Sequence, residues 1–226
     1  MVRGTVLDVT GPSSALRRTV VLASASPARL GLLRAAGIEP VVRVSDVDEP
    51  TVEAALAAQG RTDPIDVAST LATAKARVVA DLVREEIPGA VVIGCDSVLD
   101  LDGRALGKPS DADDAVRRWQ AMRGRSGHLR TGHTVVLLGA TPDDDRTSSD
   151  VATTHVTFAD LDDSSIEAYV ATGEPLRVAG AFTLDGIGSA FVERIDGDPS
   201  NVVGLSLPLV RRMLEALEIR WTDLWT

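Results

Sequence analysis

Short hydrophobic runs alternate with segments of helical periodicity along most of this chain. That alternation predicts an α/β domain with a largely central sheet. The first strand is predicted at residues 19–23. A helix follows, with Ser26 at the N-cap and Pro27 at the first helical position, and Gly37 stops it.

A longer helix is predicted over residues 64–85, with Asp63 supplying its start. Lys75 falls at the edge of the hydrophobic stripe of this helix, so its stem can pack on the core while its ammonium emerges into a cleft or into solvent. The stripe itself comprises Val67, Leu71, Ala74, Val78 and Leu82.

The sequence predicts a single domain over residues 19–226, preceded by an N-terminal extension at residues 1–18. Asp102-Gly103 predicts a two-residue hairpin turn. The polar segment 142–150 predicts a long hairpin loop between two strands. Residues 205–217 predict a packing helix, and Trp221 and Trp225 after it suit either a core edge or a dimer contact.

Composition narrows the classes of function. A chain of 226 residues with 44% hydrophobic residues can bury a core. Its net charge of −10 and its seven scattered aromatic residues disfavour a nucleic-acid surface. The single Cys95 excludes an internal disulfide, and no apolar run is long enough for a membrane span. We therefore expect a cytoplasmic protein that does not bind membranes.

Lysine is rare here: Lys75 and Lys108 stand against twenty-one arginines. A lysine presents a compact point charge where arginine presents a wide planar fork, so a tight phosphate pocket can accept one and exclude the other. The two lysines therefore mark candidate phosphate-binding positions.

The start of the first helix has the chemistry of an anion site. Free N–H groups and the positive end of the helix dipole lie there, and Ser24, Ser26 and Arg29 add hydrogen-bond donors. Taken alone, the segment also suits an ordinary capped turn between a strand and a helix.

Asp96 is a carboxylate embedded in the otherwise hydrophobic strand of residues 91–99. Because burying an unpaired carboxylate is costly, Asp96 should have a metal, a cation or several N–H partners. Gly94 leaves room for a ligand or a neighbouring backbone, and the hairpin return can bring Lys108 near Asp96. Glu49 could share a hard divalent ion with Asp96.

Several other signals carry no chemistry. Residues 103–110 lack the spacing of a Walker A loop, and Gly186 and Gly188 lack the third glycine of a dinucleotide-binding turn. The histidines, His128, His133 and His155, lack zinc-site spacing and predict structural or surface roles. Cys95, with no histidine partner in the sequence pattern, predicts a small core residue.

Taken together, these segments resemble the Maf (septum formation inhibitor) family of nucleoside triphosphate pyrophosphatases over roughly residues 19–215. The motifs that carry the resemblance occur in order at residues 22–29, 48–49, 75–76, 94–97, 107–109, 169–170, 173–176, 179–182 and 197–205.

The resemblance implies an elongated mixed-sheet α/β fold of the Maf and inosine-triphosphatase type, with a cleft between two lobes, and a homodimer. It implies cleavage of a nucleotide to monophosphate and pyrophosphate with Mg²⁺ or another divalent cation such as Mn²⁺. The family's catalytic aspartate matches Asp96 and its acidic metal-site position matches Glu49. Its phosphate-binding positions match Ser24, Arg29, Lys75 and Lys108, and Ser26 joins them on its local chemistry.

Three positions that separate subfamilies by base preference correspond to Ala28, Ser97 and Asp185. Ser97 favours the dTTP/UTP branch and Asp185 the 7-methyl-GTP branch, while the small Ala28 leaves room for a larger or modified base. We expect Asp96 to be the general base, a metal ligand or both. Two alternatives stay open: a non-catalytic, nucleotide-sensing regulator of cell division, and a purine-selective enzyme of the inosine triphosphate pyrophosphatase type.

Overall fold

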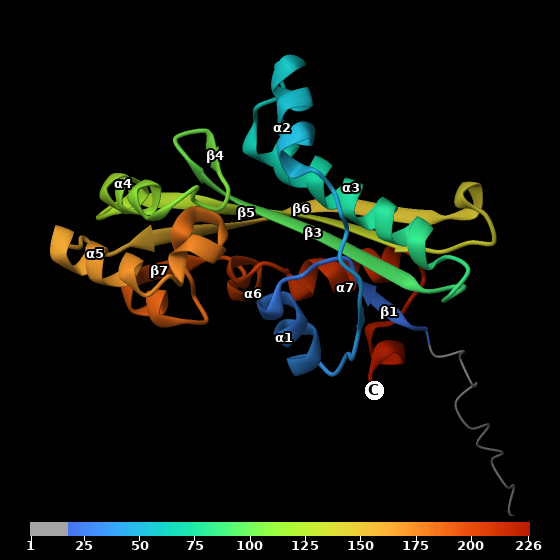
Figure 1. Cartoon of the computed structure of the whole chain (residues 1–226). Coiled ribbons are helices and arrows are strands. Elements are labelled where there is room, and N and C mark those ends of the chain that lie inside the picture. The colour runs from blue at the N-terminus through green and yellow to red at the C-terminus, as the bar shows by residue number, and fades with distance from the viewer. Residues whose placement is uncertain (1–17) are drawn as a thin grey trace, which may run out of the picture.

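The computed structural model describes residues 18–226 and has the predicted α/β fold around one mixed sheet (Figure 1). Six of the seven strands follow the order β2-β1-β3-β5-β6-β7, and the seventh, β4, pairs with the far end of β3. The strands are β1 (Val20–Leu22), β2 (Val41–Val42), β3 (Val91–Leu101), β4 (Arg104–Leu106), β5 (Ser126–Leu137), β6 (Arg146–Phe158) and β7 (Val192–Asp196). Apart from Arg18, the predicted N-terminal extension lies outside the described residues.

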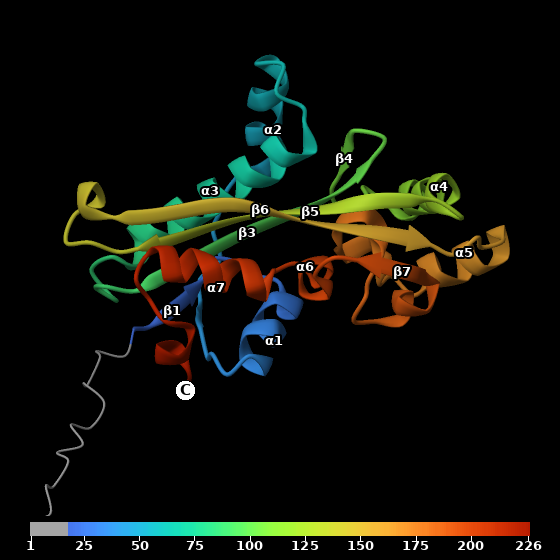
Figure 2. The same cartoon turned by 180° about the vertical axis from the view of Figure 1, so that it is seen from behind.

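Helices cover both faces of this sheet (Figures 1 and 2). On one face α3 runs along the long strands, and on the other α1 and α7 pack at the β1 end while α4 and α5 pack toward the far end. The helices are α1 (Pro27–Ala35), α2 (Glu49–Ala58), α3 (Pro64–Val83), α4 (Ala112–Met122), α5 (Asp163–Ala171), α6 (Pro199–Val203) and α7 (Leu207–Ala216). Short 3₁₀ turns η1 (Pro142–Asp144), η2 (Pro175–Arg177), η3 (Ala179–Ala181), η4 (Ile187–Phe191) and η5 (Trp221–Leu224) complete the chain.

Two separate hydrophobic clusters lie along the face of the sheet opposite α3, and they form the cores of two lobes. One joins β1 and the near half of β3 to α1 and α7 around Leu22, Leu33 and Leu214. The other surrounds Trp119, whose ring meets Phe158 edge-to-face and whose indole N–H donates to the Ala181 carbonyl oxygen at 2.7 Å. The long strands β3, β5 and β6 carry the chain between the lobes.

A gap in the sheet edge separates the two lobes. β1 pairs with β3 only as far as Ile93, where the Ala23 N–H donates to the Ile93 carbonyl oxygen. β4 begins to pair with β3 only at Leu99. Residues 94–98 of β3 therefore present a strand edge that neither β1 nor β4 covers, and an open strand edge offers backbone groups to a ligand.

Close packing of α3 against two glycines brings this helix onto the sheet. A Cβ atom added at Gly94 would lie 2.5 Å from the Ala72 carbonyl oxygen, and one at Gly132 would lie 2.3 Å from that of Ala68. Such distances are too short for any side chain, so both positions require glycine. Of the two uses predicted for Gly94, the approach of a neighbouring backbone is the one observed.

The predicted hydrophobic stripe of α3 was partly wrong. Val78 and Leu82 are 38% and 63% exposed, and Lys75 lies inside the buried stripe rather than at its edge. The stripe was predicted from hydrophobic residues at helical spacing, whereas the face that packs closely against the two glycines is rich in alanine. The buried residues of α3 are Pro64, Val67, Ala68, Leu71, Ala72, Lys75, Ala76, Val79, Ala80 and Val83.

Local turn chemistry was predicted more closely. Ser26 caps α1 and accepts from the Arg29 N–H, with Pro27 in the first turn. Asp102 and Gly103 form the two-residue turn between β3 and β4, both with positive φ as such a turn requires. The loop predicted at residues 142–150 is shorter, because β6 already begins at Arg146.

His133 has the predicted structural role. It is buried beneath α7, where its Nε2 accepts a hydrogen bond from the Ser206 N–H at 2.9 Å. Nδ1 must therefore carry the proton that it donates to the Thr131 carbonyl oxygen at 2.9 Å. Burial lowers the pKa of His133 to about 4, so the imidazole is neutral at physiological pH. His128 and His155 face each other across β5 and β6.

The two tryptophans near the end of the chain lie against the body of the protein. Trp221 packs against the β1-side core, and Trp225 lies over Gly37 at the end of α1.

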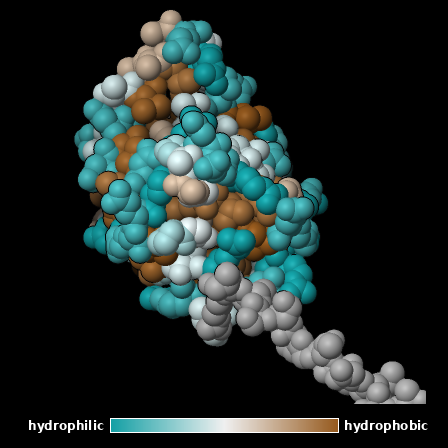
Figure 3. Space-filling view, turned by 90° about the vertical axis from the view of Figure 1, so that its right-hand side faces the viewer, coloured by the Kyte–Doolittle hydropathy of each residue, from teal (hydrophilic) through white to brown (hydrophobic). Residues whose placement is uncertain are grey.

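Viewed end-on, the surface is mainly hydrophilic with small hydrophobic patches (Figure 3). Within residues 18–226 no helix combines the length and hydrophobicity needed to cross a bilayer.

Candidate active site

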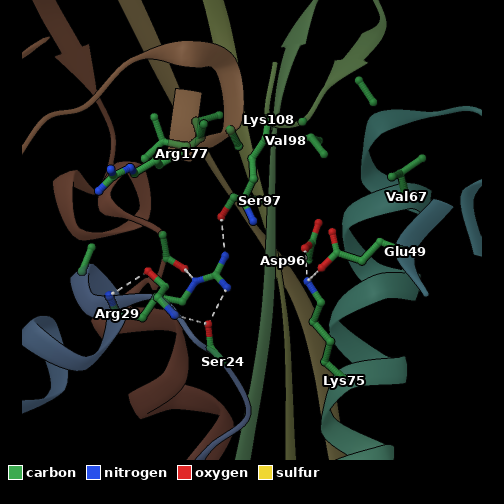
Figure 4. A pocket seen from close by; sticks show the side chains of 18 of the residues that line it. Ser24, Arg29, Glu49, Val67, Lys75, Asp96, Ser97, Val98, Lys108 and Arg177 are labelled. Atoms are coloured by element: carbon green, nitrogen blue, oxygen red, sulfur yellow. Dashed lines mark hydrogen bonds and ion pairs between the residues drawn. The ribbon is translucent and has the colours of Figure 1, made fainter. Parts of the chain in front are cut away.

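A cavity of about 970 Å³ opens at the gap in the sheet edge and is bordered by β3, the start of α1, the helices α2 and α3, and the β4 hairpin (Figure 4). Every candidate residue predicted from the sequence lines it. These residues are Ser24, Ser26, Ala28, Arg29, Glu49, Lys75, Asp96, Ser97, Lys108 and Asp185. The structure therefore brings together side chains that are up to 161 positions apart in the sequence, between Ser24 and Asp185.

A buried ion pair lies at the centre of this cavity. The Lys75 Nζ lies 2.5 Å from Asp96 Oδ1, and both residues are less than a tenth exposed. The same Nζ lies 2.6 Å from Glu49 Oε1. α3 supplies the lysine, β3 the aspartate and the first turn of α2 the glutamate, so the contact joins three elements (Figure 4).

The two carboxylates of this cluster have opposite pKa shifts. Burial raises the pKa of Asp96 above its usual range, although the charges of Lys75 and Arg29 oppose the shift. Burial also acts to raise the pKa of Glu49, but the Lys75 hydrogen bond and the charges of Lys75, Lys108 and Arg29 outweigh it and lower that pKa. A buried carboxylate with a raised pKa beside one that stays ionised is a common arrangement at catalytic sites.

The second oxygen of Asp96 is available to a ligand. Among residues 18–226, Oδ1 accepts from Lys75 while Oδ2 accepts no hydrogen bond and is not sealed from solvent. A water or a cation that enters the cavity can therefore reach Asp96 without breaking its contact with Lys75.

The start of α1 faces the cavity as predicted, but its side chains are already hydrogen-bonded within the protein. The Ser24 hydroxyl oxygen accepts from the Ser26 N–H at 3.2 Å and from Arg29 Nη1 at 3.1 Å. Each serine hydroxyl still has a hydrogen to donate to an anion.

Arg29, a predicted phosphate-binding residue, lines the cavity and is held by hydrogen bonds within the protein. Its Nε donates to the Gly204 carbonyl oxygen at 2.7 Å and its Nη1 to that of Cys95 at 2.9 Å. Its Nη2 donates to the Ser97 hydroxyl oxygen at 3.1 Å. Arg29 therefore ties α1, β3 and the end of α6 together at the wall of the cavity, and these contacts occupy much of its guanidinium group.

Lys108 follows the β4 hairpin and reaches the cavity from the other side. No ion pair or hydrogen bond to its ammonium occurs within residues 18–226, while Arg118 Nη1 fixes the preceding loop by donating to the Gly107 carbonyl oxygen at 2.7 Å. Lys108 is thus an unpaired cation at the mouth of the site.

The three candidate specificity positions occupy different places. Ser97 points to the side of β3 opposite Asp96, where its hydroxyl meets Arg29 and, at 2.9 Å, the Thr131 hydroxyl. Ala28 and Asp185 also line a second cavity of about 760 Å³ that adjoins the first. Only these two therefore face the adjoining space.

Three cavity residues were missed by the sequence reasoning. Glu53 lies one helical turn after Glu49, a spacing visible in the sequence, and burial together with the charges of Asp96 and Glu49 raises its pKa. Arg104 and Arg177 line the cavity, and their guanidinium groups have no hydrogen bond or ion pair within the described part of the chain. Nothing in the sequence separates these two from the other arginines.

The carboxylates satisfy the donor chemistry of a divalent cation. Within residues 18–226 no three acidic, histidine or cysteine side chains converge tightly enough to hold a metal by themselves. Asp96 and Glu49 nevertheless converge on one cation, the Lys75 ammonium, and both supply hard oxygen ligands. Mg²⁺ typically takes one or two carboxylates together with substrate phosphates, so this pair fits it.

Comparisons with known proteins identify the family of this chain. The family model described as "Maf-like protein" matches residues 19–217. A nucleoside triphosphate pyrophosphatase from Streptomyces coelicolor is 56% identical over 209 residues, which cover 92% of this chain and 95% of that protein. Proteins with the same name from Streptomyces avermitilis and Rhodococcus jostii are each 54% identical, covering 93% and 91% of this chain and 96% and 95% of their own lengths. The chain therefore belongs to the Maf-like family.

Proposed function

We propose that this protein hydrolyses nucleoside triphosphates to nucleoside monophosphate and pyrophosphate, with Asp96 as the general base. The observation that carries the proposal is the buried Asp96, which is paired through one oxygen with Lys75 and open through the other to a cavity lined by further cations. The relatives named nucleoside triphosphate pyrophosphatase supply the reaction class.

In the proposed reaction a water molecule attacks the α-phosphorus, and its proton passes to Asp96 Oδ2. The bond between the α-phosphorus and the oxygen bridging to the β-phosphorus breaks, and pyrophosphate leaves with the electron pair. The water oxygen remains on the monophosphate. The raised pKa of Asp96 favours this role, because a base is most effective when its pKa approaches the working pH.

The cations around the cavity have separate tasks in this account. Lys75 holds the Asp96 carboxylate in place and keeps it ionised, since an adjacent positive charge favours the charged form. Lys108 and the hydroxyls of Ser24 and Ser26 bind phosphate oxygens as negative charge develops on the leaving pyrophosphate. Arg29 acts mainly by positioning the start of α1 against β3.

We also propose that Mg²⁺, or Mn²⁺ in its place, is held by Asp96 and Glu49. When bound, such an ion supplies charge neutralisation to the triphosphate. Lys75 then shares the two carboxylates with the ion. The family resemblance further supports a homodimer that acts in the cytoplasm, and light scattering of the purified protein tests the first of these points.

The decisive experiment is pyrophosphate release across a panel of standard and modified triphosphates, with and without Mg²⁺. We expect stoichiometric monophosphate and pyrophosphate and a requirement for the metal. Nucleotide binding without turnover would instead support a sensing regulator. Release confined to inosine and xanthosine triphosphates would support the purine-selective alternative.

A further inference from the structure

Arg177 lies at the junction of the two cavities. It is the last residue of η2 and lines both the active-site cavity and the adjoining one. In Figure 4 its side chain lies on the α1 side of β3, across the strand from Lys75 and Glu49. Within residues 18–226 its exposed guanidinium has neither an ion pair nor a hydrogen bond. An unpaired arginine facing a cavity is a donor group that a ligand can use.

The adjoining cavity suits an aromatic ring better than a phosphate. Lys75, Lys108, Glu49 and Asp96 line only the first cavity. Most of the adjoining wall is small or hydrophobic, and includes Ala28, Gly31, Leu32, Val178, Ile187 and Val203. With the triphosphate beside Asp96, the nucleobase end of the substrate is therefore the part that reaches Arg177.

We propose that Arg177 is a specificity-determining residue that donates hydrogen bonds to the exocyclic keto oxygen of the nucleobase, so that the enzyme favours keto bases over amino bases. This inference rests on the proposed function. Guanine, hypoxanthine, uracil and thymine present an oxygen acceptor at the position where adenine and cytosine present an amino donor. The arginine side chain has only hydrogen-bond donors. It can therefore donate to the oxygen of a keto base, whereas the amino group of an amino base would place a donor against a donor.

Asp185 complements this assignment. Its exposed carboxylate lines the same junction and can accept from the ring N–H next to the keto oxygen. In the reversed arrangement, Asp185 would take an amino group and Arg177 a ring nitrogen. A ring nitrogen has one lone pair, whereas a keto oxygen has two, so the reversed arrangement leaves most of the guanidinium fork unpaired.

The test compares substrates that differ only at the exocyclic atom: UTP with CTP, and ITP with ATP. We expect the wild-type kcat/KM for pyrophosphate release to favour the keto member of each pair by about tenfold or more. Arg177→Ala should bring each ratio close to one, mainly by losing activity on UTP and ITP. Arg177→Lys, which keeps the charge but loses the fork, should retain part of the preference. Arg212→Ala, an exposed arginine on α7 that lines neither cavity, should keep both ratios.

Calorimetric binding of the α,β-imido analogues of the same nucleotides separates this inference from the proposed function. Preferential binding of the keto analogues that Arg177→Ala abolishes would support the inference even if no nucleotide were hydrolysed. Unchanged ratios in Arg177→Ala, a preference for amino bases, an equal loss on all four substrates, or no binding of any analogue would each overturn it.

Discussion

The Lys75 Nζ lies 2.5 Å from Asp96 Oδ1 in the interior of the protein, and this contact joins α3 to the free edge of β3. Each partner offsets the free-energy cost of burying the other, because an unpaired charge in a protein interior is strongly destabilising. The pair also leaves the second Asp96 oxygen open to the cavity. Stability and chemistry therefore depend on the same two side chains.

Removing the lysine should destabilise the fold. Lys75→Met leaves Asp96 buried without its cation, and we expect the free energy of unfolding to fall by about 3 kcal/mol. Urea denaturation measures this loss. Adding Asp96→Asn to the Lys75→Met protein should recover part of it, since the buried charge is then gone. Equal stability of Lys75→Met and wild type would show that the pair is not buried as described.

The pH dependence of turnover should follow Asp96. A general base must be ionised, so kcat/KM falls as pH drops through the pKa of Asp96, which burial raises. The acid limb should therefore lie above the range in which an ordinary aspartate titrates. In Lys75→Met the loss of the neighbouring positive charge should move that limb to still higher pH. If the acid limb of this variant lies at the same pH as that of the wild type, Lys75 does not influence the pKa of Asp96.

Acid should weaken the fold through His133. Its pKa is about 4 in the folded protein and about 6.5 in an unfolded chain, so only the unfolded state binds the proton between these values. The stabilising effect is present above about pH 6.5 and is lost as pH falls to about 4, by an amount on the order of 3 kcal/mol. Urea midpoints measured across this range should show a smaller pH dependence in His133→Asn than in wild type. The exposed His128→Asn control should keep the wild-type slope.

Gly94 should tolerate no side chain. In Gly94→Ala the new Cβ would meet the Ala72 carbonyl oxygen at 2.5 Å and the Ala76 nitrogen at 2.7 Å, both on the backbone of α3. We expect a loss of about 1–3 kcal/mol as the helix moves away, together with reduced turnover because Lys75 moves with it. Gly31→Ala is the matched control: Gly31 is an exposed position of α1 where an added Cβ meets nothing within 4 Å, and the variant should gain up to about 1 kcal/mol. Thermal unfolding of both variants distinguishes overpacking from a general effect of alanine.

Features that depend on neighbouring residues were predictable from the sequence. The cap formed by Ser26 and Pro27 and the turn at Asp102 and Gly103 follow from local backbone preferences, and the structure has both. An aspartate in a hydrophobic strand required a partner, and Lys75 is that partner.

Features that depend on distant residues were not predictable in the same way. The orientation of α3 depends on its close approach to Gly94 and Gly132, so a stripe predicted from helical spacing alone misplaced Lys75. The role of Arg29 depends on carbonyl groups of Cys95 and Gly204, which only folding brings near. Arg177 gives no local signal at all, because what distinguishes it is the absence of a partner within residues 18–226.

Pyrophosphate release by Asp96→Asn tests the central claim most directly. Asparagine keeps the shape of the side chain but cannot take a proton from water at neutral pH, so we expect turnover to fall by about 100-fold or more. Urea denaturation should confirm in parallel that the variant is folded. A folded Asp96→Asn protein that releases pyrophosphate at nearly the wild-type rate would contradict the account.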